Sequence, residues 1–379
     1  MKLLKVVLCT LLFAVFFSTG ASAESEAGKN DTDSLYTDQY NSLQIEDLNE
    51  LLPKETTEAF KTSGIDFSDI NSLKKINFSF VFSCFCAYLK DGIKTPLRIT
   101  AAVSGIFMIF SSINAMWDNS KSEPEKIAVF AAVSLIILQP VCELIRATAF
   151  VIQTISKFML GLIPVIAAIF VSSGRAAAAG SFSPVLLGTA EGMSQFVSFV
   201  FLPLINCFFS LSLCSGISPF KGFCSLCKSI QKFAVWGMGI ATTLFLSLLS
   251  VQTSLSNAAD NIGLKTSKAV ISGALPVFGT AIAETLSTAQ GCLSILRGSI
   301  GIYGVLAIVL TAMPVIIQLV AFNAGMFICT SVSEFLSFKG AGELLQAVRF
   351  CLSVLLGALC FSALLFILAI AAITRAGGN

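Results

Sequence analysis

The sequence contains no histidine, and it is also poor in charge, because only 12% of its 379 residues are Asp, Glu, Lys or Arg. Soluble domains average about 25% charged residues. Without histidine the chain lacks the commonest general base, the usual Ser–His and Cys–His nucleophile pairs and imidazole metal ligands. It also lacks a Walker-type phosphate loop. We therefore expect no enzymatic activity, no cofactor and no bound metal.

Basic clusters dense enough to hold a nucleic acid are also missing. What the chain has instead is apolar residues, which make up 55% of it and give a mean hydropathy of +0.85. In a bilayer every backbone N–H and C=O must be bonded within the protein, so apolar windows near 20 residues form helices. We predict an all-α polytopic membrane protein in which about seven helices cross the lipid bilayer. The predicted spans are Leu97–Met116, Ile127–Ile145, Ala147–Val171, Val185–Leu213, Phe233–Ser250, Ile300–Phe322 and Phe350–Ile373.

Glu143 and Arg146 lie where the second and third predicted spans meet, and they mark either a turn or the middle of one long helix. The loop Cys214–Phe233 carries three lysines and no acid, which predicts a cytoplasmic loop. Four spans counted from an exported N-terminus would leave this loop outside. We therefore expect that one of the four is miscounted, within Ile127–Val171.

The N-terminus is predicted to be a signal peptide, residues 1–23, because two lysines precede an apolar run and Ala21-Ser22-Ala23 supplies a cleavage pattern. The alternative is an uncleaved anchor. Residues 24–96 form an exported segment, since twelve of the 22 acidic residues fall between Glu24 and Asp69. Within it, Ile76–Leu89 is too short to cross comfortably and is expected to lie in the headgroup layer. Residues 97–379 form the transmembrane domain.

A polar stretch, "VQTSLSNAADNIGLKTSKAVISGALPVFGTAIAETLSTAQG", interrupts the apolar windows at Val251–Gly291. We interpret residues 255–296 as a broken or re-entrant helix facing a polar cavity, because irregular backbone is tolerated in a membrane only where it is buried in protein or lines water. The alternative is an exported loop followed by one short polar helix. The candidate residues for a polar pathway or subunit contact are Asp260, Lys265, Lys268, Pro276, Gly279 and Glu284.

A second segment, "SPVLLGTAEGMSQF" from Ser183, has the same order of Pro-Val, Gly-Thr-Ala and Glu as "LPVFGTAIAETLST" from Leu275. Matched Pro/Gly-interrupted segments can mark paired elements of a transport fold, although so biased a composition also produces such similarity by chance. This comparison adds Glu191 to the candidate residues. It also suggests that residues 172–192 form a loop or a re-entrant or broken helix.

Two close cysteine pairs, Cys84/Cys86 and Cys224/Cys227, could each be half a zinc site or a redox pair. A zinc site needs four ligands and a thioredoxin-like pair needs its βαβ setting. We expect neither pair to bind metal.

The region around "VQTSLSNAADNIGLKTSKAVISGALPVFGTAIAETLSTAQGCLSILRGSIGIYGVL" resembles the stage III sporulation protein AE family of endospore-forming Firmicutes. The resemblance extends to "MLGLIPVIAAIFVSSG" and "FLPLI" and covers Lys157–Ile373. It implies a membrane component of the stage III A channel or secretion complex, in the mother-cell membrane that surrounds the forespore. The implied partners are the other stage III A operon membrane proteins and, through the complex, the forespore stage II protein Q.

Two other functions fit the residues without the resemblance. One is an independent secondary transporter, and the other is a structural membrane anchor that recruits partners through its acidic segment.

Overall fold

The computed structural model describes residues 51–62, 78–116, 123–172, 176–217, 225–237, 239–241, 243–245, 247–248 and 279–376. Helices make up nearly all of this part of the chain, and no strand occurs in it, so the predicted all-α class is confirmed. The elements are α4 (Lys54–Thr62), α6 (Phe78–Met116), α7 (Glu123–Ser172), α8 (Ala176–Phe196), the π-helix η1 (Val197–Phe201), α9 (Leu202–Ile217), α11 (Gly279–Phe335) and α12 (Lys339–Ala376). The predicted signal peptide lies outside the described residues.

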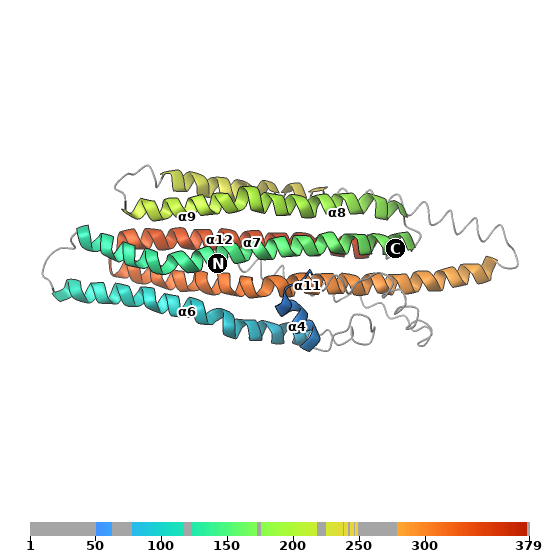
Figure 1. Ribbon diagram of the computed structural model, residues 1–379, viewed down its shortest axis with the longest axis horizontal. Helices are drawn as coiled ribbons and strands as arrows, with labels where there is room; N and C mark the ends of the chain where they lie inside the picture. Colours follow the sequence, from blue (N-terminus) through green and yellow to red (C-terminus); the bar gives the residue numbers. More distant parts are fainter. Residues whose placement is uncertain are drawn as a thin grey trace.

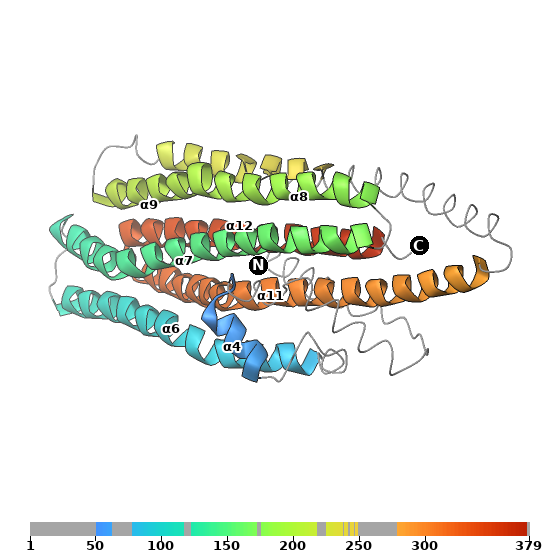
Figure 2. The same cartoon turned by 45° about the vertical axis from the view of Figure 1, so that its right-hand side comes forward.

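The long helices run side by side and form an elongated bundle (Figures 1 and 2). α8, η1 and α9 follow one another as one continuous rod, which packs on α7 and α12. α11 packs on α12 and α7 and also carries α6 along its other side. The short helix α4 lies across α11, where the hydroxyl oxygens of Thr56 and Thr311 are 3.2 Å apart in a buried hydrogen bond.

Of the two alternatives for Glu143 and Arg146, the structure has the single long helix. The spans predicted at Ile127–Ile145 and Ala147–Val171 are one continuous helix, α7, of 50 residues, so the expected miscount among the first four spans is confirmed. Glu143 does not end it, because this side chain lies on the exposed face and accepts a hydrogen bond from Gln139 Nε2 (2.9 Å) within the same helix. By contrast, the prediction of a separate helix at Ile76–Leu89 is wrong, since α6 begins at Phe78 and continues to Met116 through Pro96.

Prolines occur inside α6, α7, α8 and α11 without ending any of them. A proline removes one intrahelical hydrogen bond, but in a membrane helix neighbouring side chains can bond the backbone groups that it frees. Pro96 leaves the carbonyl of Gly92 without its helical donor, while its own carbonyl, which the proline does not free, accepts a hydrogen bond from Thr100 Oγ1 (2.8 Å). These prolines are therefore poor markers of helix ends in so apolar a chain.

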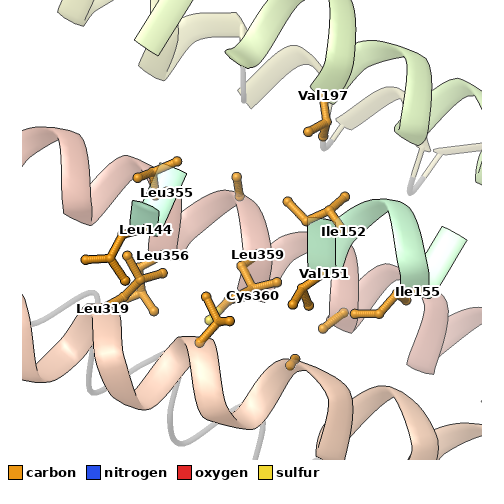
Figure 3. Packing of buried hydrophobic residues seen from close by; sticks show 14 of the residues in the cluster. Leu144, Val151, Ile152, Ile155, Val197, Leu319, Leu355, Leu356, Leu359 and Cys360 are labelled. Carbon is orange, nitrogen blue, oxygen red and sulfur yellow. The ribbon is translucent and has the colours of Figure 1, made fainter. Parts of the chain in front are cut away.

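The core lies where α7, α11 and α12 meet. Figure 3 shows Leu144 of α7 beside Leu356 of α12 and Leu319 of α11. Further along the same cluster, Ile152 of α7 points toward the rod of α8, η1 and α9, and Leu359 of α12 lies below it. All five side chains are buried. Tyr303 of α11 joins the same core with 1% of its surface exposed, between Phe60 of α4 and Phe158 of α7, whose ring centroids lie 5.8 and 5.9 Å away.

The turn between α11 and α12 is the best-defined helix end in the bundle. Ser337 has a left-handed backbone, with φ of 62°. Its N–H donates to Glu334 O (3.1 Å) and the next N–H, of Phe338, donates to Ser333 O (2.9 Å). These two bonds are the Schellman pattern, which satisfies carbonyls that a helix end leaves unpaired. Phe338 is buried and stacks on Phe107 of α6, so the turn is fixed to the bundle.

Five helical segments in the described part of the chain are long and apolar enough to cross a membrane: Phe82–Ile113, Ile127–Ser172, Ser183–Cys214, Ser299–Phe335 and Gly340–Ala371. Of the predicted Phe233–Ser250 span, the described residues are helical as well. Three long helices, rather than four, precede the basic loop at Cys214–Phe233. Three crossings from an exported N-terminus would place that loop in the cytoplasm, which removes the conflict with the positive-inside tendency.

Candidate functional site

The polar stretch expected to form a broken helix is only partly described. Asp260, Lys265, Lys268 and Pro276 lie outside the described residues. Gly279 is the first residue of α11, and Glu284 lies five residues further along the same helix. Residues 279–296 are regular helix, and the residues before Gly279, where a break would lie, are outside the described part of the chain.

The second expected break, at residues 172–192, is wrong for the residues that are described. Ala176–Phe196 is the helix α8, and it continues through η1 into α9. Pro184 lies inside α8, and Gly188 lies on its exposed surface with open space around its α-carbon. This segment is therefore the first half of a long rod.

Glu191 is the one predicted site residue whose side chain the structure describes. It lies exposed on α8 and accepts a hydrogen bond from Gln195 Nε2 at 2.6 Å, one helical turn further along. Both residues belong to the span Ser183–Cys214. An exposed carboxylate in an apolar span is costly against lipid, so it marks a place where water or another protein is expected.

A hydrogen bond between two helices continues this polar surface. Gln153 of α7 donates from Nε2 to Ser198 Oγ of η1, at 3.0 Å. Lys157 lies one turn beyond Gln153 on α7 and is exposed. α7 and α8 run in opposite directions. Lys157 follows Gln153 in the sequence and Gln195 precedes Ser198, so both lie in the same direction along the bundle from the Gln153–Ser198 hydrogen bond. We call these five residues the polar strip: Gln153, Lys157, Glu191, Gln195 and Ser198.

The polar strip coincides with the one π-helical segment of the described chain, Val197–Phe201. A π-turn adds a residue to the helix and shifts the side chains that follow, and such bulges occur frequently at functional sites. Val197 and Phe201 are buried, whereas Ser198 is half-buried and reaches Gln153. The π-turn therefore lies where the buried face of α8 continues into that of α9, and at this same point η1 is hydrogen-bonded to α7.

Sequence reasoning missed four of the five residues of the polar strip. The signal that could find them is the spacing of Glu191, Gln195 and Ser198 at i, i+4 and i+7, which places all three on one helix face. Gln153 and Lys157 repeat the i, i+4 spacing on α7. A search for polar residues at helical spacing inside apolar windows would have detected both helices.

A smaller polar group lies between α11 and α12. Asn323 Nδ2 donates to Ser353 Oγ at 2.7 Å, and Arg349 places its guanidinium 4.7 Å from the centre of the Phe327 ring. The Nε of Arg349 is buried and has no hydrogen-bond partner. This group holds two helices together and presents a cation beside an aromatic ring, which is a favourable contact.

These side chains can exchange hydrogen bonds and charge, but they offer no nucleophile paired with a base. In the described part of the chain no three His, Cys, Asp or Glu side chains are grouped so that they could hold a metal ion. The polar strip is suited to contact water, an ion or the polar groups of another helix.

A bundle of long apolar helices with an outward polar strip defines the protein as a polytopic helical membrane protein. Comparison with known families makes the assignment specific: the family described as Stage III sporulation protein AE matches residues 67–377, and the chain belongs to that family. A relative from Bacillus subtilis (strain 168), named Stage III sporulation protein AE, is 28% identical over 204 residues. That alignment covers 54% of this chain and 51% of the relative, so the chain spans about half the length of the curated relative it matches. No solved structure matches.

Proposed function

We propose that the protein is a non-enzymatic subunit of the stage III A channel or secretion complex, located in the mother-cell membrane around the forespore and needed for forespore development. Membership of the stage III sporulation protein AE family supports a role in sporulation. The proposed partners are the other stage III A operon membrane proteins and, through them, the forespore stage II protein Q.

The polar strip is the observation that carries a subunit role. Lys157, Glu191 and Gln195 are exposed, although all three belong to apolar spans. Facing lipid, they would be among the most costly residues of the bundle. Facing a polar helix of a neighbouring subunit, or water that such a neighbour encloses, they gain hydrogen bonds instead. An outward strip of this kind therefore favours a component of a larger assembly over a solitary transporter, whose polar pathway would lie inside its own bundle.

The test is co-purification of the full-length tagged protein from sporulating cells. In the test variant Glu191→Leu and Gln195→Leu are combined, which removes the hydrogen-bonded pair from the polar strip. The control combines Glu143→Leu and Gln139→Leu, because this pair has the same i, i+4 spacing, exposure and hydrogen bond on α7 but lies away from the strip.

At equal abundance in the membrane, we expect the strip variant to lose its partners and forespore development, while the control keeps both. Retention of every partner by the strip variant would remove the polar strip from the proposal. Solute flux by the purified parent protein alone in vesicles, together with no co-purifying partner, would favour the independent transporter.

A further inference from the structure

A cavity of about 730 Å³ lies between α12 and the helical stretch 225–237, and it opens outward from the bundle. Its lining is mostly apolar: Phe233, Val235 and Trp236 on the stretch, and Phe350 on α12. Trp236 remains 66% exposed, so most of the indole ring has no packing partner among the described residues. The stretch is held against the bundle on its other side, where Cys227 is buried and lies 3.8 Å from Ser212 Oγ of α9.

The polar residues at this cavity are Gln231 and Lys232. Lys228 lies one turn before Lys232 on the same helix face, and both lysines are exposed. No acidic residue occurs anywhere between Glu191 and Asp260 in the sequence. The mouth of the cavity is therefore cationic, with no neighbouring carboxylate in its own segment to neutralise it.

Exposed apolar side chains follow the lysines along the chain. Val235, Trp236, Ile240 and Leu244 are all at least 39% exposed. One leaflet of hydrocarbon is about 15 Å deep, half of a core about 30 Å thick, and an α-helix covers that depth in about ten residues. The stretch from Val235 to Leu244 is ten residues long and therefore matches the depth that one lipid chain occupies.

We propose that this cavity binds an anionic phospholipid, whose phosphate contacts Lys228 and Lys232 while one acyl chain fills the cavity and follows Trp236, Ile240 and Leu244. Basic pockets between membrane helices bind anionic headgroups, and tryptophan favours the boundary between headgroup and hydrocarbon. The lysines select for a negatively charged headgroup. The apolar lining contacts the acyl chain, so a lipid gains a contact that a soluble phosphate cannot make. The inference does not depend on the proposed function.

Trp236 provides the measurement, because the sequence has only two tryptophans and the other, Trp117, can be replaced by Phe. The full-length Trp117→Phe protein is reconstituted in phosphatidylcholine vesicles that contain a low mole fraction of acyl-brominated phosphatidylglycerol or acyl-brominated phosphatidylcholine. Bromine quenches tryptophan only at contact. We expect the anionic lipid to reach the same quenching at a roughly 25-fold lower mole fraction, as two lysines at about 1 kcal/mol each predict.

In this background Lys232→Gln should lower the preference to about fivefold, and Lys228→Gln combined with Lys232→Gln should make the two lipids quench equally. Lys157→Gln should leave the preference unchanged. Lys157 is the matched control because it is also an exposed lysine in an apolar helix, on α7. Equal quenching of the parent by both lipids would overturn the proposal. It would also be overturned if neither lipid quenched Trp236, as expected of a cavity closed by a second copy of the chain. Circular dichroism of each variant confirms that the helices are retained.

Discussion

Gly325 of α11 lies so close to Thr100 of α6 that a β-carbon added to the glycine would overlap the threonine hydroxyl. The same hydroxyl donates to Pro96 O at 2.8 Å, so it cannot turn away without losing that bond. One turn further along, Ser104 Oγ and Cys329 Sγ are 3.7 Å apart. Small residues let membrane helices approach closely, and Gly325 does this for the α6–α11 pair.

We predict that Gly325→Ala lowers the stability of the bundle by about 1–3 kcal/mol, the usual cost of inserting a methyl group into a well-packed interface. Thermal unfolding of the detergent-solubilised protein measures it. Combining Gly325→Ala with Thr100→Ala removes the overlapping hydroxyl and should recover most of the loss. Gly357→Ala is the control, since no atom lies within 4 Å of its added β-carbon. A Gly325→Ala protein as stable as the parent would show that α6 can shift freely along α11.

In the turn between α11 and α12 we predict a substitution that raises the stability of the protein instead of lowering it. Ser337 adopts a left-handed backbone that costs a residue with a β-carbon about 1–2 kcal/mol and costs glycine little. Ser337→Gly should therefore raise the midpoint of thermal unfolding. Ser331→Gly, at an exposed position inside α11, should lower it, because glycine in a helix interior costs about 0.5–1 kcal/mol. The expectation fails if the two variants shift the midpoint in the same direction.

Composition and hydrophobic windows were sufficient to predict the class of the fold. A chain with this mean hydropathy and without strands in its described part leaves little choice other than packed apolar helices. Helix ends were harder to predict, for a physical reason. Pro96 would favour a break in water, where the solvent can bond the carbonyl that it frees, and Glu143 suggested a turn because a charge is costly in lipid, but neither residue ends α6 or α7.

The candidate site was predicted less well than the fold. Sequence reasoning selected Glu191 from a short internal similarity, and the structure places that residue in the polar strip. It did not select Gln153 or Ser198, because it did not use their helical spacing to Lys157 and Glu191, and a single Gln or Ser is not distinctive without that spacing. Their importance comes from the contact between α7 and η1, and the π-turn that forms it has no known composition signal in this sequence.

Cys224 and Cys227 are predicted to bind no metal. Cys227 is buried against Ser212, so its thiol is used in packing, while Cys224 lies outside the described residues. A four-ligand shell would need cysteines from elsewhere, because the chain has no histidine. Replacing both cysteines by Ser should leave assembly and sporulation intact. Metal analysis of the purified protein is the check, and stoichiometric zinc that disappears in the double variant would contradict the prediction.

Glu284 lies on a part of α11 that extends beyond the neighbouring helices. Figures 1 and 2 show the N-terminal end of α11 projecting past the ends of α7, α8 and α12. A carboxylate that faces lipid is costly, so at this position a contact with a partner or with water is expected.

We predict that Glu284→Leu gives a protein that is inserted at the normal level but does not support forespore development, because the partner or water contact of the carboxylate is lost. Glu343→Gln is the control and should behave as wild type. Glu343 is an exposed residue near the start of α12, where no described side chain bonds to it. Spore yield is compared at equal membrane abundance, since a misfolded variant would have the same phenotype as an inactive one. Normal sporulation of the Glu284→Leu strain at wild-type protein level would show that this carboxylate has no role in function.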